Sequence, residues 1–238
     1  MQVFELTIPY TWKGQTQYIH PVLIETPDNL FLVDGGYAGF MPLIAESMKT
    51  YDRTLDQLTG IIITHHDIDH CGALAEIKEA FPHIKVYASW LEALYLSGKR
   101  KSQRLHQIQS LLPSIPKEER AEALAFQAKL ESMKHVTVDV YLDETWHADI
   151  WAIPTPGHTI GHISLYIPSL KTLITADAFV VEDNRFEIAD IQYTLDLPNA
   201  IASIHKIRQF PIEKVICYHG GTVTENLEQR FDELLTFF

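Results

Sequence analysis

The sequence predicts an α/β fold in which two sheets pack face to face and helices cover their outer sides. Short apolar runs rich in β-branched residues are typical of buried strands, and they alternate with helical periodicity in two regions, 1–97 and 136–238. Between these regions, residues 98–135 have helical patterning, mixed charge and two prolines, Pro113 and Pro116. We therefore predict one domain over 1–238, a four-layer αβ/βα sandwich with a helical insertion at 98–135.

The individual elements follow from the period of their apolar residues. We expect strands at 3–8, 22–25, 30–33, 60–64, 84–88, 136–142, 150–153, 163–167, 172–175 and 214–217. We expect helices at 40–51, 70–81, 89–96, 102–112, 117–133, 198–209 and 224–236, and Pro198 suits the first turn of its helix.

Composition narrows the class of protein. The formal net charge of −12 would repel phosphate backbones, which argues against a nucleic-acid partner. The N-terminus lacks a basic segment followed by an apolar one, and no apolar run is long enough to span a membrane. Two cysteines, Cys71 and Cys217, are too few for a disulfide framework. We expect a cytoplasmic protein with no membrane partner.

A dense group of ligand-type residues follows the predicted strand at 60–64. The segment reads His65-His66-Asp67-Ile68-Asp69-His70. In extended backbone, residues two apart point the same way, so His65 and Asp67 can face one point. Asp69 and His70, at the start of the next helix, can face a second point beside it. This arrangement is what two adjacent metal ions require.

Four side chains cannot complete two coordination spheres, so further ligands are expected at other strand ends. Three candidates follow apolar strands directly: His158 after 150–153, Asp177 after 172–175 and His219 after 214–217. Three strands that each end near a histidine or an aspartate are difficult to explain by packing alone.

These motifs resemble the metallo-β-lactamase superfamily, in particular its lactonase and glyoxalase II branch. The resemblance covers nearly the whole chain and includes three further segments: Val33-Asp34-Gly35-Gly36, Pro156-Gly157-His158-Thr159-Ile160-Gly161-His162 and Tyr218-His219-Gly220. It implies the metallo-β-lactamase fold and a site for two divalent metal ions.

The resemblance also implies a division of the ligands. One metal would be bound by His65, Asp67 and His158, the other by Asp69, His70 and His219, and Asp177 would bridge them. Asp34 matches an aspartate that orients ligands in the family. Asp69 is placed to hold or relay the proton of the attacking water.

Asp67 departs from the family pattern, which has a histidine at this position. Aspartate is a competent ligand in the correct phase, so we expect it to bind metal. Three carboxylates and a hydroxide then cancel the charge of two divalent ions, whereas a histidine would leave one net positive charge. This count predicts a higher pKa for the bound water and a more alkaline activity optimum. Carboxylate-rich ligation also favours harder ions, so zinc is expected first, with iron or manganese as alternatives.

The predicted activity is hydrolysis of a small ester-type substrate, a lactone or thioester, by a metal-bridging hydroxide. Two alternatives are open: a small-molecule phosphodiesterase, and a diiron redox protein similar to flavodiiron proteins but without their flavodoxin domain. His66 should point away from the metals as a loop residue, and His162 should have a structural role. Apolar positions within 98–135 could line a substrate pocket, form a homodimer interface or pack together.

Overall fold

The computed structural model describes residues 1–143, 145–189 and 191–236. Its first sheet contains β1 (Gln2–Glu5), β4 (Val22–Glu25), β5 (Leu30–Val33), β6 (Gly60–Ile63), β7 (Lys85–Ser89) and β8 (Val140–Leu142), in that order. The second contains β15 (Gly221–Val223), β14 (Lys214–Cys217), β11 (Thr172–Ala176), β10 (Ile163–Ile167) and β9 (Trp151–Pro154). Two hairpins form separate two-stranded sheets: β2 (Ile8–Trp12) with β3 (Gln15–Ile19), and β12 (Val180–Glu182) with β13 (Arg185–Glu187).

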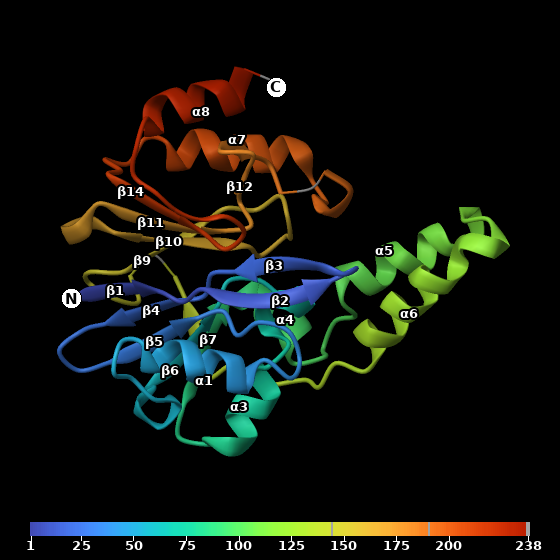
Figure 1. The fold of residues 1–238 in the computed structure, drawn as a ribbon, viewed down its shortest axis with the longest axis horizontal. Coiled ribbons are helices and arrows are strands. Elements are labelled where there is room, and N and C mark those ends of the chain that lie inside the picture. Colours follow the sequence, from blue (N-terminus) through green and yellow to red (C-terminus); the bar gives the residue numbers. More distant parts are fainter. Residues whose placement is uncertain (144, 190, 237–238) are drawn as a thin grey trace.

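The described residues form eight α-helices: α1 (Met41–Lys49), α2 (Ile68–Cys71), α3 (Leu74–Ala80), α4 (Trp90–Leu96), α5 (Gln103–Leu111), α6 (Arg120–Glu131), α7 (Leu197–Ile207) and α8 (Leu227–Thr236). Figure 1 shows α7 and α8 on the outer face of the second sheet and α1 and α3 beyond the first sheet, with the two sheets between them. The predicted αβ/βα sandwich is therefore confirmed.

The packing of β6 shows how the layers are held together. Successive residues of a strand point to opposite faces. Ile61 and Ile63 pack in the cluster that includes Leu74 of α3, whereas Ile62 packs in the cluster between the sheets, with Ile174 of β11. Both faces of the strand are buried, which explains why its sequence is continuously apolar rather than alternating. A third cluster packs the second sheet against α7 and α8.

The differences from the predicted elements lie at half-exposed or interrupted segments. The single strand expected at 3–8 is divided, because β1 ends at Glu5 and β2 begins at Ile8. The β2–β3 hairpin turns at Lys13 and Gly14, both with positive φ, and it was missed because its strands are mostly exposed and polar. Of the strand expected at 136–142, only β8 forms.

Residues 98–135 form the predicted helices, and α5 and α6 lie beside each other away from the two-sheet body (Figure 1). Within 98–135, Leu130 is buried, whereas Leu111 and Leu124 are half exposed. None of the helices in the described ranges combines the length and apolarity that a membrane span requires.

We predict that Ile62→Ala lowers the free energy of unfolding by about 2–5 kcal/mol, because it leaves a cavity between the two sheets where Ile62 is fully buried. Urea denaturation measures the change. The matched control is Ile160→Ala, because Ile160 is 47% exposed and its truncation should cost no more than about 0.5 kcal/mol. Equal losses in the two variants would contradict this account of the core.

Candidate metal centre

The predicted ligands come together because their strands end at the same edge of the sandwich. In the second sheet, β9 and β11 are each antiparallel to β10, and β11 is parallel to β14, so β9, β11 and β14 run in one direction. His158, Asp177 and His219 follow the carboxyl ends of these strands. In the first sheet, β5 and β6 are parallel, and β6 leads into the segment 65–70.

One group of ligand atoms, here called the second half-site, comes from Asp69, His70, Asp177 and His219. His219 Nε2 lies 3.2 Å from Asp69 Oδ2 and 3.8 Å from Asp177 Oδ1. His70 Nε2 lies 3.7 Å from Asp69 Oδ2 and 3.3 Å from Asp177 Oδ1. Ligand atoms of a tetrahedral zinc ion are about 3.4 Å apart, so these separations suit a metal ion.

The other group, here called the first half-site, comes from His65, His158 and Asp177. His158 Nε2 lies 3.5 Å from Asp177 Oδ2. Asp67 Oδ2 lies 3.0 Å from His158 Nε2 and 3.6 Å from His65 Nε2, so Asp67 also faces this group. Asp177 turns one oxygen to each half-site, which is the geometry expected of a bridging carboxylate.

The chemistry of these atoms fits bound cations. Three buried atoms that face the half-sites have no hydrogen-bond partner in the structure: His65 Nε2, His70 Nε2 and Asp177 Oδ1. Buried polar atoms are normally paired, and unpaired ones call for an explanation such as an ion. Burial and the neighbouring His70 hold the pKa of His65 well below its usual value, so its imidazole is in the neutral form that binds metal.

The charge around His70 also favours a cation. Burial alone would lower the pKa of His70, but the negative charges of Asp177, Asp69 and Asp34 outweigh burial and raise the pKa well above its usual value. A buried site that raises the pKa of a histidine in this way stabilises positive charge. A divalent ion would supply that charge directly.

Asp34 contacts one of the candidate ligands, His70. Its Oδ2 lies 2.8 Å from His70 Nδ1 and accepts a hydrogen bond from Thr64 Oγ1, while its Oδ1 accepts from Thr64 N. These contacts direct His70 Nε2 toward the second half-site. Asp34 has a φ of 62°, a left-handed conformation that is uncommon outside glycine and concentrated at functional sites.

His162 has the structural role that the sequence predicted, and it supports Asp177. Asp177 N donates to His162 Nε2 at 3.1 Å, and His162 Nδ1 lies 2.8 Å from Thr155 Oγ1. Thr155 Oγ1 is 3.0 Å from Ser164 Oγ, which donates to the Thr175 carbonyl oxygen. Burial lowers the pKa of His162 to about 3. These buried groups connect β9, β10 and β11 next to Asp177.

Arg104 of α5 is the main feature that the sequence did not reveal. Its Nε donates to both oxygens of Asp67, at 3.0 and 2.8 Å, and only 3% of the residue is exposed. Burial acts to raise the pKa of Asp67, but the Arg104 cation, together with hydrogen bonds to His158 and His65, holds it well below its usual value. With two divalent ions bound, the guanidinium of Arg104 would add one positive charge beside Asp67. An alkaline activity optimum therefore no longer follows from Asp67 alone.

His66 points away from the half-sites, but it is not the plain loop residue that we expected. It is buried, its ring stacks on Tyr95, and its Nδ1 lies 2.5 Å from Glu92 Oε2. Glu92, fully buried in α4, also accepts hydrogen bonds from Thr159 Oγ1 and Gly161 N. Glu92 therefore links the segment 65–70 to the loop that carries His158.

That loop also needs a glycine at one position. Gly157 has a φ of 143°, and a Cβ on it would lie 2.4 Å from Ala200 Cα in α7. A side chain here would push the loop away from α7 and displace His158, so the close approach explains the glycine in Pro156-Gly157-His158.

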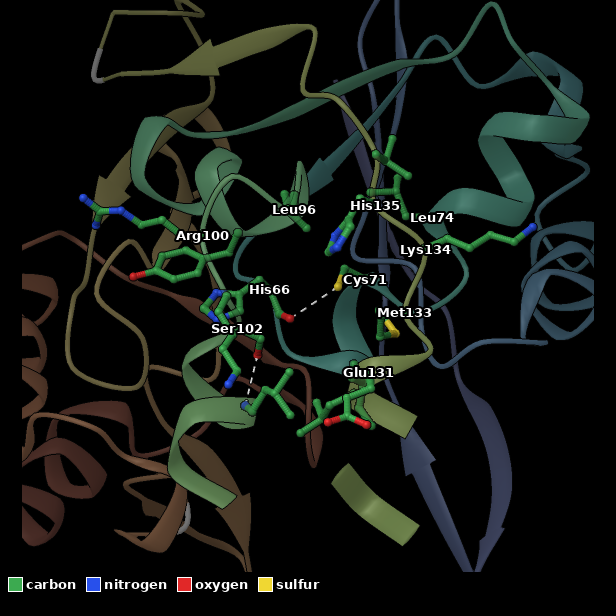
Figure 2. A pocket seen from close by; sticks show the side chains of 17 residues that line it. His66, Cys71, Leu74, Leu96, Arg100, Ser102, Glu131, Met133, Lys134 and His135 are labelled. Atoms are coloured by element: carbon green, nitrogen blue, oxygen red, sulfur yellow. Dashed lines mark hydrogen bonds between the residues drawn. The ribbon is translucent and has the colours of Figure 1, made fainter. Parts of the chain in front are cut away.

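A cavity of about 210 Å³ lies behind the segment 65–70 rather than at the half-sites. Its lining includes His66 and Cys71 as well as Glu131 and Met133 of the helical segment (Figure 2). His65, Asp67, Asp69 and His70 are absent from its lining, so the cavity is separate from the candidate ligands.

Comparisons with known proteins agree with the fold and place the chain among metallo-hydrolases. The family model described as the metallo-beta-lactamase superfamily matches residues 17–219. The chain belongs to this superfamily, which confirms the resemblance seen in its motifs.

Individual relatives share less than a third of their aligned residues with this chain. The chain is 29% identical to the probable metallo-hydrolase YflN of Bacillus subtilis, over 87% of this chain and 82% of that protein. It is 27% identical to a hydroxyacylglutathione hydrolase of Bartonella quintana, over 77% of this chain and 56% of that protein. A metallo-beta-lactamase family protein from Thermus thermophilus has the same fold, with a TM-score of 0.75 at 17% identity, over 99% of this chain and 78% of that structure.

We predict that Asp34→Asn weakens metal binding at the second half-site by about 10–100-fold, because the amide cannot orient His70 as the carboxylate does. Competition with a chromophoric chelator measures the affinity. Asp28→Asn, a change at an exposed position, should leave it unchanged. An unaltered affinity in folded Asp34→Asn would show that His70 needs no such support.

We also predict a pH-dependent loss of stability in Glu92→Gln. Burial would lower the pKa of His66, but the charge of Glu92 and its hydrogen bond to the ring, together with the charge of Asp67, raise it. The resulting stabilisation is fully present below the unfolded value of about 6.5 and is lost as the pH rises through the folded value.

Glu92→Gln should therefore lose more free energy of unfolding at about pH 5.5 than at about pH 9. Urea denaturation of chelator-treated protein at both pH values measures this difference. Glu118→Gln, at an exposed position, is the control. A loss that is the same at both pH values would mean that the pair contributes only through neutral hydrogen bonds.

Proposed function

We propose that this protein hydrolyses a small ester-type substrate, a thioester or a lactone, at a centre that holds two divalent metal ions, with zinc the first expectation. The observation that carries the proposal is the position of Asp177, whose two oxygens face two groups of ligand atoms. Pairs of metal ions that share ligands in this way are typical of hydrolytic sites.

The thioester is favoured by similarity to a protein named for the hydrolysis of hydroxyacylglutathione. That relative is matched over 56% of its length, so its substrate is carried over as a class of bond rather than as a particular molecule. The net charge of −12 counts against long phosphodiester substrates.

When bound, two divalent ions would lower the pKa of a shared water and polarise the scissile carbonyl. The protein supplies the positions of the groups around that water. Asp69 Oδ2 faces the second half-site, and its side chain retains partial exposure, at 18%. Asp69 is therefore placed to accept the proton of the attacking water and to release it to solvent or to the leaving group.

The substrate class is tested with purified protein of known metal content. Elemental analysis identifies the metals, and turnover is then measured with a lactone, an acyl thioester and bis-p-nitrophenyl phosphate. We expect hydrolysis of the lactone or the thioester. Turnover of the phosphodiester alone would replace the proposal with a phosphodiesterase, and stoichiometric iron with oxygen reduction but no hydrolysis would replace it with a redox protein.

We predict that Asp177→Asn lowers kcat/KM for the hydrolysed ester by about 100-fold or more, because several kcal/mol of transition-state stabilisation depend on ions that this carboxylate holds. Steady-state kinetics measure the effect, and Asp28→Asn is again the matched control. Full activity in Asp177→Asn would exclude a centre in which Asp177 is shared.

A further inference from the structure

The first half-site differs from the second because a buried cation already lies against its ligand atoms. Arg104 Nη2 is 2.8 Å from Asp67 Oδ2 and 3.0 Å from His158 Nε2. A guanidinium has only donors, so it directs N–H groups at the same two atoms that a metal ion in the first half-site would need.

Arg104 is held firmly in this position. Its Nη1 donates to Gln107 Oε1 at 3.2 Å, and its Cζ lies 5.5 Å from the centre of the Tyr193 ring. Gln107 in turn donates to the Gln192 carbonyl oxygen. The guanidinium is thus tied to α5 on one side and to the segment around Tyr193 on the other, and moving it would break several contacts at once.

The second half-site has a different charge environment. Its carboxylates, Asp69 and Asp177, form ion pairs only with histidines, and no lysine or arginine of the described ranges pairs with them. Asp34 adds another negative charge behind His70. A divalent ion entering the second half-site meets unopposed negative charge, whereas one entering the first half-site meets the charge of Arg104.

We infer that Arg104 makes the first half-site the weaker of the two, so that metal ions fill the second half-site first. Arg104 acts in two ways: its donors compete for the lone pairs of Asp67 and His158, and its charge repels the incoming ion. Arg104, which belongs to the helical segment, therefore sets the order in which the two half-sites take up metal. This inference rests on the proposed metal centre, but it does not depend on the substrate.

The test is a titration of the chelator-stripped full chain with Zn²⁺ alone, followed by calorimetry. We expect two binding steps whose dissociation constants differ by at least about tenfold. His219→Ala should remove the tighter step, and His65→Ala should remove the weaker one. These two variants assign each step to its half-site without any measurement of activity.

Arg104→Met, which keeps a long apolar side chain but removes the charge, should tighten the weaker step by about tenfold or more and change the tighter step by less than about twofold. Arg104→Gln is the second variant if Arg104→Met does not fold. Arg100→Met removes an exposed charge from the same segment and should change neither step.

Two equal steps in the unaltered protein would overturn the inference while leaving the proposed metal centre intact. A weaker step that loses affinity in Arg104→Met would also overturn it, because Arg104 would then support metal binding by orienting Asp67. Absence of any Zn²⁺ binding would overturn both this inference and the proposed function.

Discussion

The buried Asp34 carboxylate fixes the relative positions of the structural elements on which the centre depends. Asp34 lies just beyond β5, bonds Thr64 at the end of β6, and contacts His70 in α2. A carboxylate without such partners would be costly to bury. These contacts therefore maintain the left-handed backbone at Asp34 and define where β6 ends and the segment 65–70 begins. Asp34 thus determines both the orientation of His70 and the path of the chain after β6.

The sequence predicted the layers and indicated the candidate ligands, because both depend on local patterns. Continuous apolar runs mark strands buried on both faces, and His158, Asp177 and His219 could be recognised because each follows such a strand. Arg104 and Glu92 could not be recognised in this way. Each lies in a helix at a site where a charged residue is ordinarily exposed, and each acquires its role through contacts with residues distant in the chain, such as Asp67 and Thr159.

The helical segment 98–135 also combines a feature set by local sequence with one set by distant contacts. Its existence follows from periodicity, but its role follows from where α5 begins. Ser102 caps this helix by accepting a hydrogen bond from Leu105 N, and Gln103 N donates to His66 Nε2. Arg104 therefore enters the centre from the first turn of a helix that is anchored to the segment 65–70. A part of the fold that lies outside both sheets contributes directly to the charge of the site.

The hydrogen bonds around the buried His162 all run in one direction from donor to acceptor. Asp177 N can only donate, so His162 Nε2 must accept and its proton must lie on Nδ1. His162 Nδ1 therefore donates a hydrogen bond to Thr155 Oγ1, Thr155 Oγ1 donates to Ser164 Oγ, and Ser164 Oγ donates to the Thr175 carbonyl oxygen. One imidazole tautomer is thus imposed by the backbone beneath Asp177. A residue that replaces His162 must accept a hydrogen bond at one end and donate one at the other. A lysine only donates, so it would leave Asp177 N without an acceptor.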